Sequence, residues 1–280
     1  MKEIEIRPEK IFNKFVKLAE LDTKIYFKKK RKKIKCVACS RSGNFSFKKN
    51  NFSYYICKNC KTLYANPRPE ESEFLNYYKK SSSIKSLASF YKKTHKLRKK
   101  NIWQSKAQLI SKTLKKRKLT NFSYVDIGGG SGVFAEEILK YTKKNITIIE
   151  PSPFMAEQCR KKKFTVVQKF LEDVKKKDLP NNKKCFTSFE LLEHLHSPSK
   201  FIRNLSKLME KEDIFIFTTL SSTGLDIAVL WEKSRSVNPP YHVNFFNPNS
   251  AKIFLKKHGL KVLNISTPGN LDIDILENNK

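Results

Sequence analysis

The chain of 280 residues carries 58 basic and 26 acidic side chains, and its net charge of +32 makes it strongly basic. No apolar run reaches the roughly eighteen residues that a membrane-spanning helix needs, so no membrane span is predicted. The chain shows no secretory signal, and we therefore expect a cytoplasmic protein long enough for an enzyme core and one small additional module.

Two basic stretches predict helices on either side of a cysteine-rich segment at 36–64. Residues 1–35 are expected to form an N-terminal basic helical segment, because apolar residues follow a helical spacing over Ile4–Leu21. Residues 65–120 are expected to form a helical linker or cap, with the same spacing over Tyr77–Leu119. The N-terminal helix is expected to pack on the body of the protein.

The cysteine spacing predicts a small zinc ribbon at 36–64. Two Cys-x2-Cys pairs are separated by seventeen residues, and their members are Cys36, Cys39, Cys57 and Cys60. Two such pairs of thiolates close one structural Zn²⁺ site and leave no open position for catalysis. The apolar residues between the pairs alternate, as in a β-hairpin around the polar turn Lys48–Asn51. Ser40 and Lys61 replace the glycine that typically follows the second cysteine of each pair.

A glycine-rich motif predicts a nucleotide-type cofactor site. Residues 124–134 read as a strand, a glycine turn and the start of a helix, and a second strand ends at Glu150. Gly128, Gly130 and Gly132 suit a turn that is tight enough for backbone N–H groups to approach a ligand. A carboxylate at the end of the second strand can accept both hydroxyls of a ribose. The glycines do not have the spacing of the dinucleotide fingerprint, which argues against a dinucleotide ligand.

These residues resemble the class I S-adenosylmethionine-dependent methyltransferases, whose first motif has the form Asp-x-Gly-x-Gly-x-Gly found here from Asp126. The resemblance implies that Asp126 and the glycine turn hold the methionine portion of S-adenosylmethionine. It further implies that Glu150, followed by Pro151, holds the ribose. The protein is accordingly expected to be an enzyme that uses S-adenosylmethionine as its methyl donor.

The pattern that follows alternates between strands and helices. Strands are predicted at Thr165–Phe170, Lys184–Phe189 and Asp213–Thr219, and a helix at Pro198–Met209. Such alternation predicts an α/β fold with a doubly wound, Rossmann-like parallel sheet, which is the class I methyltransferase sheet of the resembling family. Ligands of such a sheet bind at the carboxyl ends of its strands.

Further cofactor contacts are implied by the resemblance. Phe170, Leu171 and Glu172 stand at the end of the third strand, where the family cradles adenine. Residues 189–198 closely resemble the family's segment after the fourth strand. This match adds Glu190 to the expected cofactor-binding residues.

The methyltransferase domain is expected to cover residues 121–280. A helix at Asn249–His258, with Gly259 as its C-cap, leads to an expected strand at Leu260–Ser266. A class I sheet usually finishes with a reversed strand after that one, and only fourteen residues remain. Leu271–Leu276 is the candidate for this last strand, and a C-terminally short domain is the alternative.

Other segments resemble a bacterial methyltransferase group associated with sugar and surface-polysaccharide biosynthesis, whose best-known relatives are the nucleotide-sugar C-methyltransferases. The matching segments are residues 62–71, 74–78, 242–248 and 267–275, so the resemblance covers most of residues 36–275. It implies O- or C-methylation of a sugar, a nucleotide sugar or a related small hydroxylated metabolite.

Methyl transfer to a hydroxyl or a carbon requires a base near the acceptor, and the candidates are His242, His194 and Glu193. The corresponding stretch of the sugar C-methyltransferases carries a tyrosine and then a glutamate and a histidine in succession. This sequence keeps only His242, with Pro239 and Tyr241 at the other two places. The departure makes O-methylation at least as well favoured as C-methylation.

The basic charge leaves two alternatives open. One is a zinc-ribbon RNA methyltransferase whose ribbon grips the phosphate backbone, and the other is a non-catalytic cofactor-binding homologue. Nucleic acid is not the favoured partner, because the lysines are spread through every segment together with many Asn, Ile and Phe, as an AT-rich genome encodes. Asn238–Tyr241 spells the Asn-Pro-Pro-Tyr motif that amino-methyltransferases place after the fourth strand. Here it follows the fifth strand, and we interpret it as a loop that leads to His242.

Overall fold

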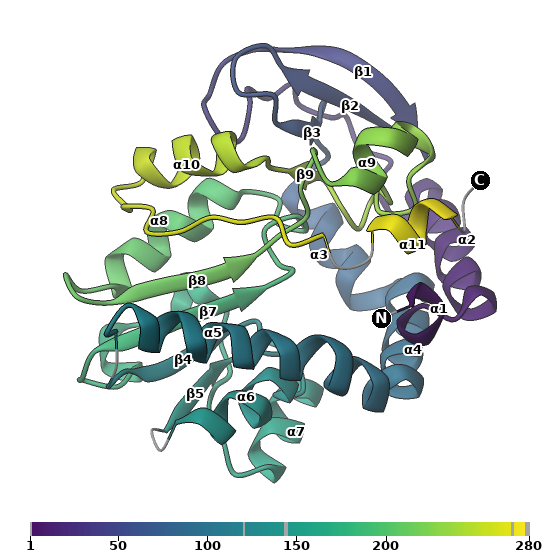
Figure 1. The fold of residues 1–280 in the computed structure, drawn as a ribbon. Coiled ribbons are helices and arrows are strands. Elements are labelled where there is room, and N and C mark those ends of the chain that lie inside the picture. The colour runs from purple at the N-terminus through teal and green to yellow at the C-terminus, as the bar shows by residue number, and fades with distance from the viewer. Residues whose placement is uncertain (1, 120, 143–144, 270–271, 278–280) are drawn as a thin grey trace. The chain divides into compact units, whose positions relative to one another are not determined.

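The computed structural model describes residues 2–119, 121–142, 145–269 and 272–277 (Figure 1). The chain divides into two units. The first unit contains Met1–His95, Leu192–Ser199 and Thr219–Lys280, and the second contains Lys96–Leu191 and Lys200–Thr218. Residues after Thr218 therefore group with the N-terminal part of the chain. No helix formed by the described residues is both long enough and apolar enough to cross a membrane.

The second unit is built on a parallel sheet. Its strands are β4 (Ser123–Ile127), β5 (Ile146–Ile149), β6 (Thr165–Val167), β7 (Lys184–Phe189) and β8 (Ile214–Thr218). Within the described residues the sheet has five strands in the order β6-β5-β4-β7-β8, and each neighbouring pair is parallel. In this doubly wound order the winding reverses beside β4, and ligands bind at the carboxyl ends of the strands there. The predicted α/β class and its parallel sheet are confirmed.

Helices pack against this sheet (Figure 1). They are α5 (Ser105–Lys116), α6 (Val133–Ile138), α7 (Pro153–Lys161) and α8 (Pro198–Leu208), with shorter helical turns η1 (Lys99–Gln104), η2 (Leu139–Tyr141), η3 (Leu171–Asp173) and η4 (Lys176–Asp178). Ile110 of α5 and Phe134 of α6 share one buried apolar cluster with Ile148 of β5. Every residue of β4 is buried, as expected of a strand with neighbours on both sides.

The first unit contains the predicted hairpin as part of an antiparallel sheet (Figure 1). Strands β1 (Gly43–Lys49), β2 (Phe52–Cys57) and β3 (Leu63–Ala65) are joined by β9 (Asn244–Phe245) in the order β1-β2-β3-β9. Asn50 and Asn51 form the turn between β1 and β2 with φ angles of 44° and 62°, which confirms the predicted hairpin. Strand β9 was not predicted, because its two residues carry no strand pattern of their own.

Helices complete the first unit. They are α1 (Glu3–Ile6), α2 (Glu9–Tyr26), α3 (Glu71–Lys80), α4 (Ser82–Arg98), α9 (Leu225–Leu230), η5 (Trp231–Lys233), α10 (Pro248–Lys257) and α11 (Asp272–Glu277). The helix predicted at Ile4–Leu21 is interrupted, because Pro8 has no N–H to donate and instead stands at the N-cap of α2. Phe27, Phe52 and Phe74 belong to the buried cluster that joins the end of α2, α3 and α9 to the antiparallel sheet.

Two strands predicted near the C-terminus are wrong. In the described part of the chain, residues 260–266 form no strand and β8 pairs with β7 alone, so these residues have no ladder partner. Leu271 lies outside the described residues, and the rest of the second candidate strand forms helix α11. Ile275 of α11 is buried, and the carboxylate of Asp274 accepts a hydrogen bond from the backbone N–H of Glu3. Helix α11 thus packs against α9 and is tied to α1 by this hydrogen bond, instead of extending a sheet.

Candidate functional site

The carboxyl end of β4 opens into the predicted glycine turn. Gly128, Gly130 and Gly132 have φ angles of 69°, 54° and 74°, in the left-handed region that favours glycine. A Cβ atom at Gly129 would lie 2.8 Å from Oδ2 of Asp126, whereas one at Gly130 would meet no atom within 4 Å. The turn is therefore closed on the side of Asp126 and open at Gly130, where a ligand has room to approach the backbone.

Asp126 is only 1% exposed, and its two carboxylate oxygens have different surroundings. Oδ1 accepts a 2.7 Å hydrogen bond from the hydroxyl of Thr187, whereas Oδ2 is buried with no hydrogen-bond partner among the described residues. Burial raises the pKa of Asp126 to about 7. The hydrogen bond from Thr187 and the positive charge of Lys106 oppose this rise, whereas the negative charge of Glu150 adds to it. A cationic ligand beside Oδ2 would restore the ionised carboxylate and satisfy the buried oxygen.

Glu150 follows β5 and ties that strand to the glycine turn. Its Oε2 accepts a 2.9 Å hydrogen bond from the N–H of Gly130, and its Oε1 accepts one of 2.9 Å from the N–H of Ser152. Burial raises the pKa of Glu150, and these two backbone hydrogen bonds oppose the shift. Each carboxylate oxygen has two lone pairs, so both oxygens can also accept hydrogen bonds from a ligand.

The other predicted cofactor residues of this unit lie at or beside strand ends. Pro151 is half-buried directly after Glu150, and Glu172 is exposed in η3. Phe170, the N-cap of η3, is 48% exposed, and Leu171 beside it is 5% exposed. An exposed aromatic ring next to a buried leucine provides an apolar surface after β6.

Glu190 follows β7 with a φ angle of 50°, which is uncommon for a residue other than glycine. Its Oε1 accepts hydrogen bonds of 2.6 Å from the hydroxyl of Thr218 and 3.3 Å from the ammonium of Lys106. Lys106 also lies 4.7 Å above the ring of Phe189. Thr218 and Lys106 were missed in the sequence analysis. Thr218 ends β8 and could have been found by the strand-end rule that selected Glu190, whereas no sequence pattern marks Lys106.

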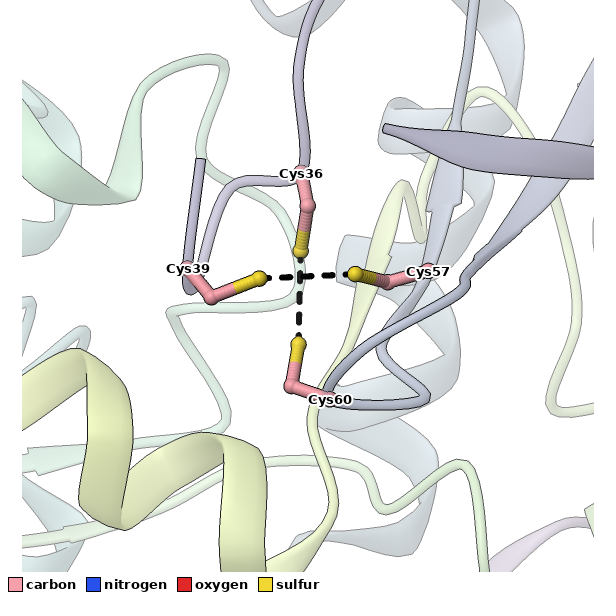
Figure 2. A group of neighbouring side chains, drawn as sticks. All are labelled: Cys36, Cys39, Cys57 and Cys60. Atoms are coloured by element: carbon pink, nitrogen blue, oxygen red, sulfur yellow. Dashed lines mark hydrogen bonds between the residues drawn. The ribbon is translucent and has the colours of Figure 1, made fainter. Parts of the chain in front are cut away.

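The four cysteines of the ribbon converge on one point (Figure 2). Sγ of Cys36 lies 3.5 Å from Sγ of Cys60, Sγ of Cys39 lies 3.4 Å from Sγ of Cys57, and all four sulfurs lie within 4.8 Å of one another. In a tetrahedral zinc site the Zn–S bonds of about 2.3 Å place the sulfurs about 3.8 Å apart. The structure thus brings the four predicted metal ligands together in an arrangement that suits one tetrahedral ion.

The residues that replace the usual knuckle glycines adopt the glycine-like conformation. Ser40 and Lys61 have φ angles of 60° and 58°. The N–H of Ser40 donates to the carbonyl of Cys36 at 2.9 Å, and the N–H of Lys61 donates to the carbonyl of Cys57 at 3.2 Å. Both Cys-x2-Cys pairs therefore form the same turn, although the left-handed backbone costs these two residues about 1–2 kcal/mol each.

The three predicted catalytic residues lie together in the first unit. One ring nitrogen each of His194 and His242 and a carboxylate oxygen of Glu193 all lie within 4.8 Å of one another. Glu193 is 1% exposed, and its Oε2 accepts a 2.7 Å hydrogen bond from the hydroxyl of Thr219. The backbone carbonyl of Glu193 accepts a 2.8 Å hydrogen bond from the N–H of Val243, which holds the two segments side by side. We call Glu193, His194 and His242 the histidine cluster.

Backbone carbonyls orient both imidazole rings of the histidine cluster. Nδ1 of His194 lies 2.7 Å from the carbonyl oxygen of Tyr241, and Nδ1 of His242 lies 2.7 Å from that of Ser236. A carbonyl oxygen can only accept, so Nδ1 of each ring carries a hydrogen and the lone pair of the neutral imidazole is on Nε2. Rings held in this way can take up a proton or bind a metal ion.

Comparison with known proteins decides the family. A family model described as a methyltransferase domain matches residues 94–265, which is more than half of the chain. The chain belongs to this methyltransferase domain family. It is a class I, S-adenosylmethionine-dependent methyltransferase, which confirms the predicted enzyme class. No curated protein matches this methyltransferase in sequence.

Solved structures share the fold of the methyltransferase at low sequence identity. The plantazolicin methyltransferase BpumL in complex with a monoazolic desmethylPZN analog and SAH has a TM-score of 0.52 and 14% identity, over 72% of this chain and 84% of its own. The plantazolicin methyltransferase BamL in complex with a triazolic desmethylPZN analog and SAH has a TM-score of 0.52 and 13% identity, over 66% and 71% of the two chains.

The second unit of the methyltransferase fits S-adenosylmethionine chemically. The cofactor carries a positive sulfonium and a positive ammonium group, and its ribose presents two hydroxyl donors. The buried Oδ2 of Asp126 lacks a hydrogen-bond partner among the described residues, and Glu150 supplies a second carboxylate beside Gly130. Negative charge, hydrogen-bond acceptors and an open backbone turn thus meet at the ends of β4 and β5.

Proposed function

We propose that this methyltransferase transfers a methyl group to a hydroxyl of a sugar, a nucleotide sugar or a related small hydroxylated metabolite. The observation that carries the proposal is the histidine cluster, in which two oriented imidazoles and a buried carboxylate lie within 4.8 Å of one another. A hydroxyl is a weak nucleophile until it loses its proton, and imidazole is the side chain best suited to accept a proton near neutral pH. The cluster is therefore assigned to the acceptor.

The assigned step is an in-line displacement. The acceptor oxygen forms a bond to the methyl carbon, and the bond between that carbon and the sulfonium sulfur breaks. The sulfur keeps the electron pair and becomes the neutral thioether of S-adenosylhomocysteine. The hydroxyl proton passes to Nε2 of His242. His194 lies beside this ring, and the nearby carboxylate of Glu193 stabilises the positive charge that the ring gains.

For the donor we assign the residues at the strand ends of the second unit. Asp126 and the turn of Gly128, Gly130 and Gly132 hold the methionine portion, because the buried carboxylate of Asp126 calls for a cation. The remaining donor residues surround the ribose and the adenine, and they are Glu150, Pro151, Phe170, Leu171, Glu172 and Glu190. The apolar surface of Phe170 and Leu171 suits an adenine ring.

Substitution of Glu150 by alanine is expected to weaken the binding of S-adenosylmethionine. The loss of a charge-assisted hydrogen bond to the ribose costs about 1.5–3 kcal/mol, which is roughly a ten- to hundredfold higher Kd by calorimetry. Glu157→Ala is the matched control, because Glu157 is an exposed glutamate on the helix that follows. An unchanged Kd for Glu150→Ala would remove Glu150 from the ribose site.

For the ribbon we propose one structural Zn²⁺ held by Cys36, Cys39, Cys57 and Cys60. Two observations support this assignment. The four sulfurs converge on one point (Figure 2), and both Cys-x2-Cys pairs form the same turn. Four thiolates fill a tetrahedral ion, so the zinc stabilises the fold and takes no part in methyl transfer.

A labelled-methyl assay tests the acceptor class. The methyltransferase is incubated with S-adenosylmethionine tritiated on its methyl group and, in parallel, with a mixture of nucleotide sugars, a polysaccharide extract and total RNA. We expect label in the hydroxylated small molecules. Label that enters only the RNA would replace the proposal by the RNA methyltransferase alternative. Cofactor binding without transfer to any of the three would favour a non-catalytic homologue.

A further inference from the structure

The histidine cluster combines the ligand types of a metal centre. Two imidazole nitrogens and one carboxylate oxygen, each from a different side chain, lie within 4.8 Å of one another. In a tetrahedral site with bonds of about 2.0–2.2 Å the ligand atoms lie about 3.4 Å apart. Each of the three ligand atoms therefore has to move by only roughly an ångström or less to bind one common ion. Side-chain rotation of that size leaves the backbone in place.

The surroundings of the two histidines match those of metal ligands. A metal-ligating histidine almost always donates its other ring N–H to a carbonyl or a carboxylate, which fixes the tautomer and the orientation of the ring. His194 and His242 both do so, with Nδ1–H donated at 2.7 Å to the carbonyls of Tyr241 and Ser236. With Nδ1–H donated in this way, Nε2 is the nitrogen of each neutral ring whose lone pair can bind a metal ion.

The backbone around the histidine cluster is held by its own hydrogen bonds. The hydroxyl of Tyr54 donates at 2.6 Å to the carbonyl of His242, whose own N–H donates at 3.0 Å to the carbonyl of Asn238. The side chain of Asn244 donates to the carbonyls of Leu192 and Leu195 at 3.0 Å and 2.8 Å, on either side of the other two ligands. A ligand set fixed in this way loses little conformational freedom when it takes up an ion.

We propose that Glu193, His194 and His242 bind a redox-inert divalent cation of the zinc type, separate from the ion of the four cysteines. Two histidines and one carboxylate form a ligand set of catalytic zinc centres, in which a further position stays open for water or substrate.

The chemical role of this ion rests on the proposed function, whereas its binding does not. The acceptor hydroxyl occupies the open position, and the ion lowers the pKa of that hydroxyl so that its proton passes to water. The oxygen then forms its bond to the methyl carbon as the carbon–sulfur bond breaks, and the electron pair stays on sulfur. In the metal-loaded enzyme, Nε2 of His242 acts as a ligand and the ion takes over the acidification of the hydroxyl.

Cobalt titration of the full chain tests the binding. Protein with its cysteine site filled is dialysed against a weak chelator and titrated with Co²⁺. We expect one equivalent of Co²⁺ per chain to bind with visible ligand-field absorption but without a thiolate charge-transfer band. His242→Gln and His194→Gln should weaken this binding by about a hundredfold or more, because they remove a ligand outright. His242→Asp, which restores a ligand at the same position, should retain part of it.

His258→Gln is the matched control, because Nδ1 of His258 also contacts a backbone carbonyl, that of Phe254 at 2.8 Å, outside the histidine cluster. This variant should bind Co²⁺ like the parent protein. The inference is overturned if the parent binds no such equivalent, or if His242→Gln binds it unchanged while its circular dichroism shows a folded chain. If Co²⁺ or Zn²⁺ binds as described and no hydroxylated acceptor is methylated, the metal site stands and the proposed function fails. If methyl transfer proceeds without any such binding, the inference fails and the base role of His242 stands.

Discussion

Substitution of His242 by alanine or glutamine is expected to lower kcat for the acceptor by about 10²- to 10⁴-fold. The hydroxyl must lose its proton as the bond to the methyl carbon forms, and the variant lacks the nitrogen that brings this about. The Kd for S-adenosylmethionine should not change, because His242 is assigned to the acceptor and not to the residues that hold the donor. Single-turnover rates with labelled donor, together with calorimetry of cofactor binding, measure the two effects separately.

His258→Gln serves as the control for this prediction as well, and it should keep the kcat of the parent. The half-buried ring of His242 lies beside His194, with 4.9 Å between the ring centroids, so circular dichroism must first show that each variant is folded. Full activity of a folded His242→Gln on the true acceptor would remove His242 from the mechanism. The acceptor-activating group would then be sought in Glu193 and His194.

Removal of the cysteine-bound ion is expected to unfold the ribbon and leave the parallel sheet intact. Binding of structural zinc supplies about 10–16 kcal/mol in zinc-finger peptides, which is the same order as the stability of a whole domain. Cys60→Ser should therefore lower the zinc content by one ion per chain and abolish amide protection from hydrogen exchange in β1, β2 and β3. Protection in β4, β5 and β7 should persist, because these strands are buried in an apolar cluster of their own.

Loss of the ion is expected to affect β9 and α10 as well as the ribbon. The side-chain amide of Asn247, which also caps α10, donates a 2.8 Å hydrogen bond to the carbonyl of Cys60. Loss of the ion should therefore also expose β9 and the start of α10 to exchange. Cys185→Ala is the control, because Cys185 is a buried cysteine of the second unit and its loss should not change the zinc content. A Cys60→Ser protein with full zinc content and an unchanged exchange pattern would show that the four thiols hold no ion.

The cofactor side of the protein follows from local patterns to a large extent. Asp126, the glycine turn and Glu150 each lie where a strand ends and the chain turns. Both the end of a strand and a turn can be recognised from the types of a few neighbouring residues. Parallel strands bring their carboxyl ends to one edge, so the neighbourhood of these residues could be predicted without knowledge of the packing. Lys106 could not be predicted in this way. It reaches Glu190 and Thr218 only because α5 lies along the sheet. The sequence around a lysine on a helix does not indicate where that helix packs.

The C-terminal region shows where local patterns fail. Residues 260–266 carry apolar residues that suit a strand, yet among the described residues they do not pair with β8, whose second edge has no neighbouring strand. Conversely, Asn244 and Phe245 have no strand pattern and become β9, because β3 offers them a partner. In both cases the backbone hydrogen bonds are long-range, and the segment's own residues do not determine them.

The sequence by itself determined the class of sheet, the glycine turn and the set of four cysteines, because each depends on spacing within a short stretch of chain. Only the tertiary structure decided that Glu193 and His194 meet His242. Their approach depends on the hydrogen bond from Val243 to Glu193, on the pairing of β9 with β3, and on carbonyls that orient the two rings. These contacts join residues that are distant in sequence, and their geometry depends on the packing of the whole first unit. The local pattern of apolar and polar residues does not determine that packing.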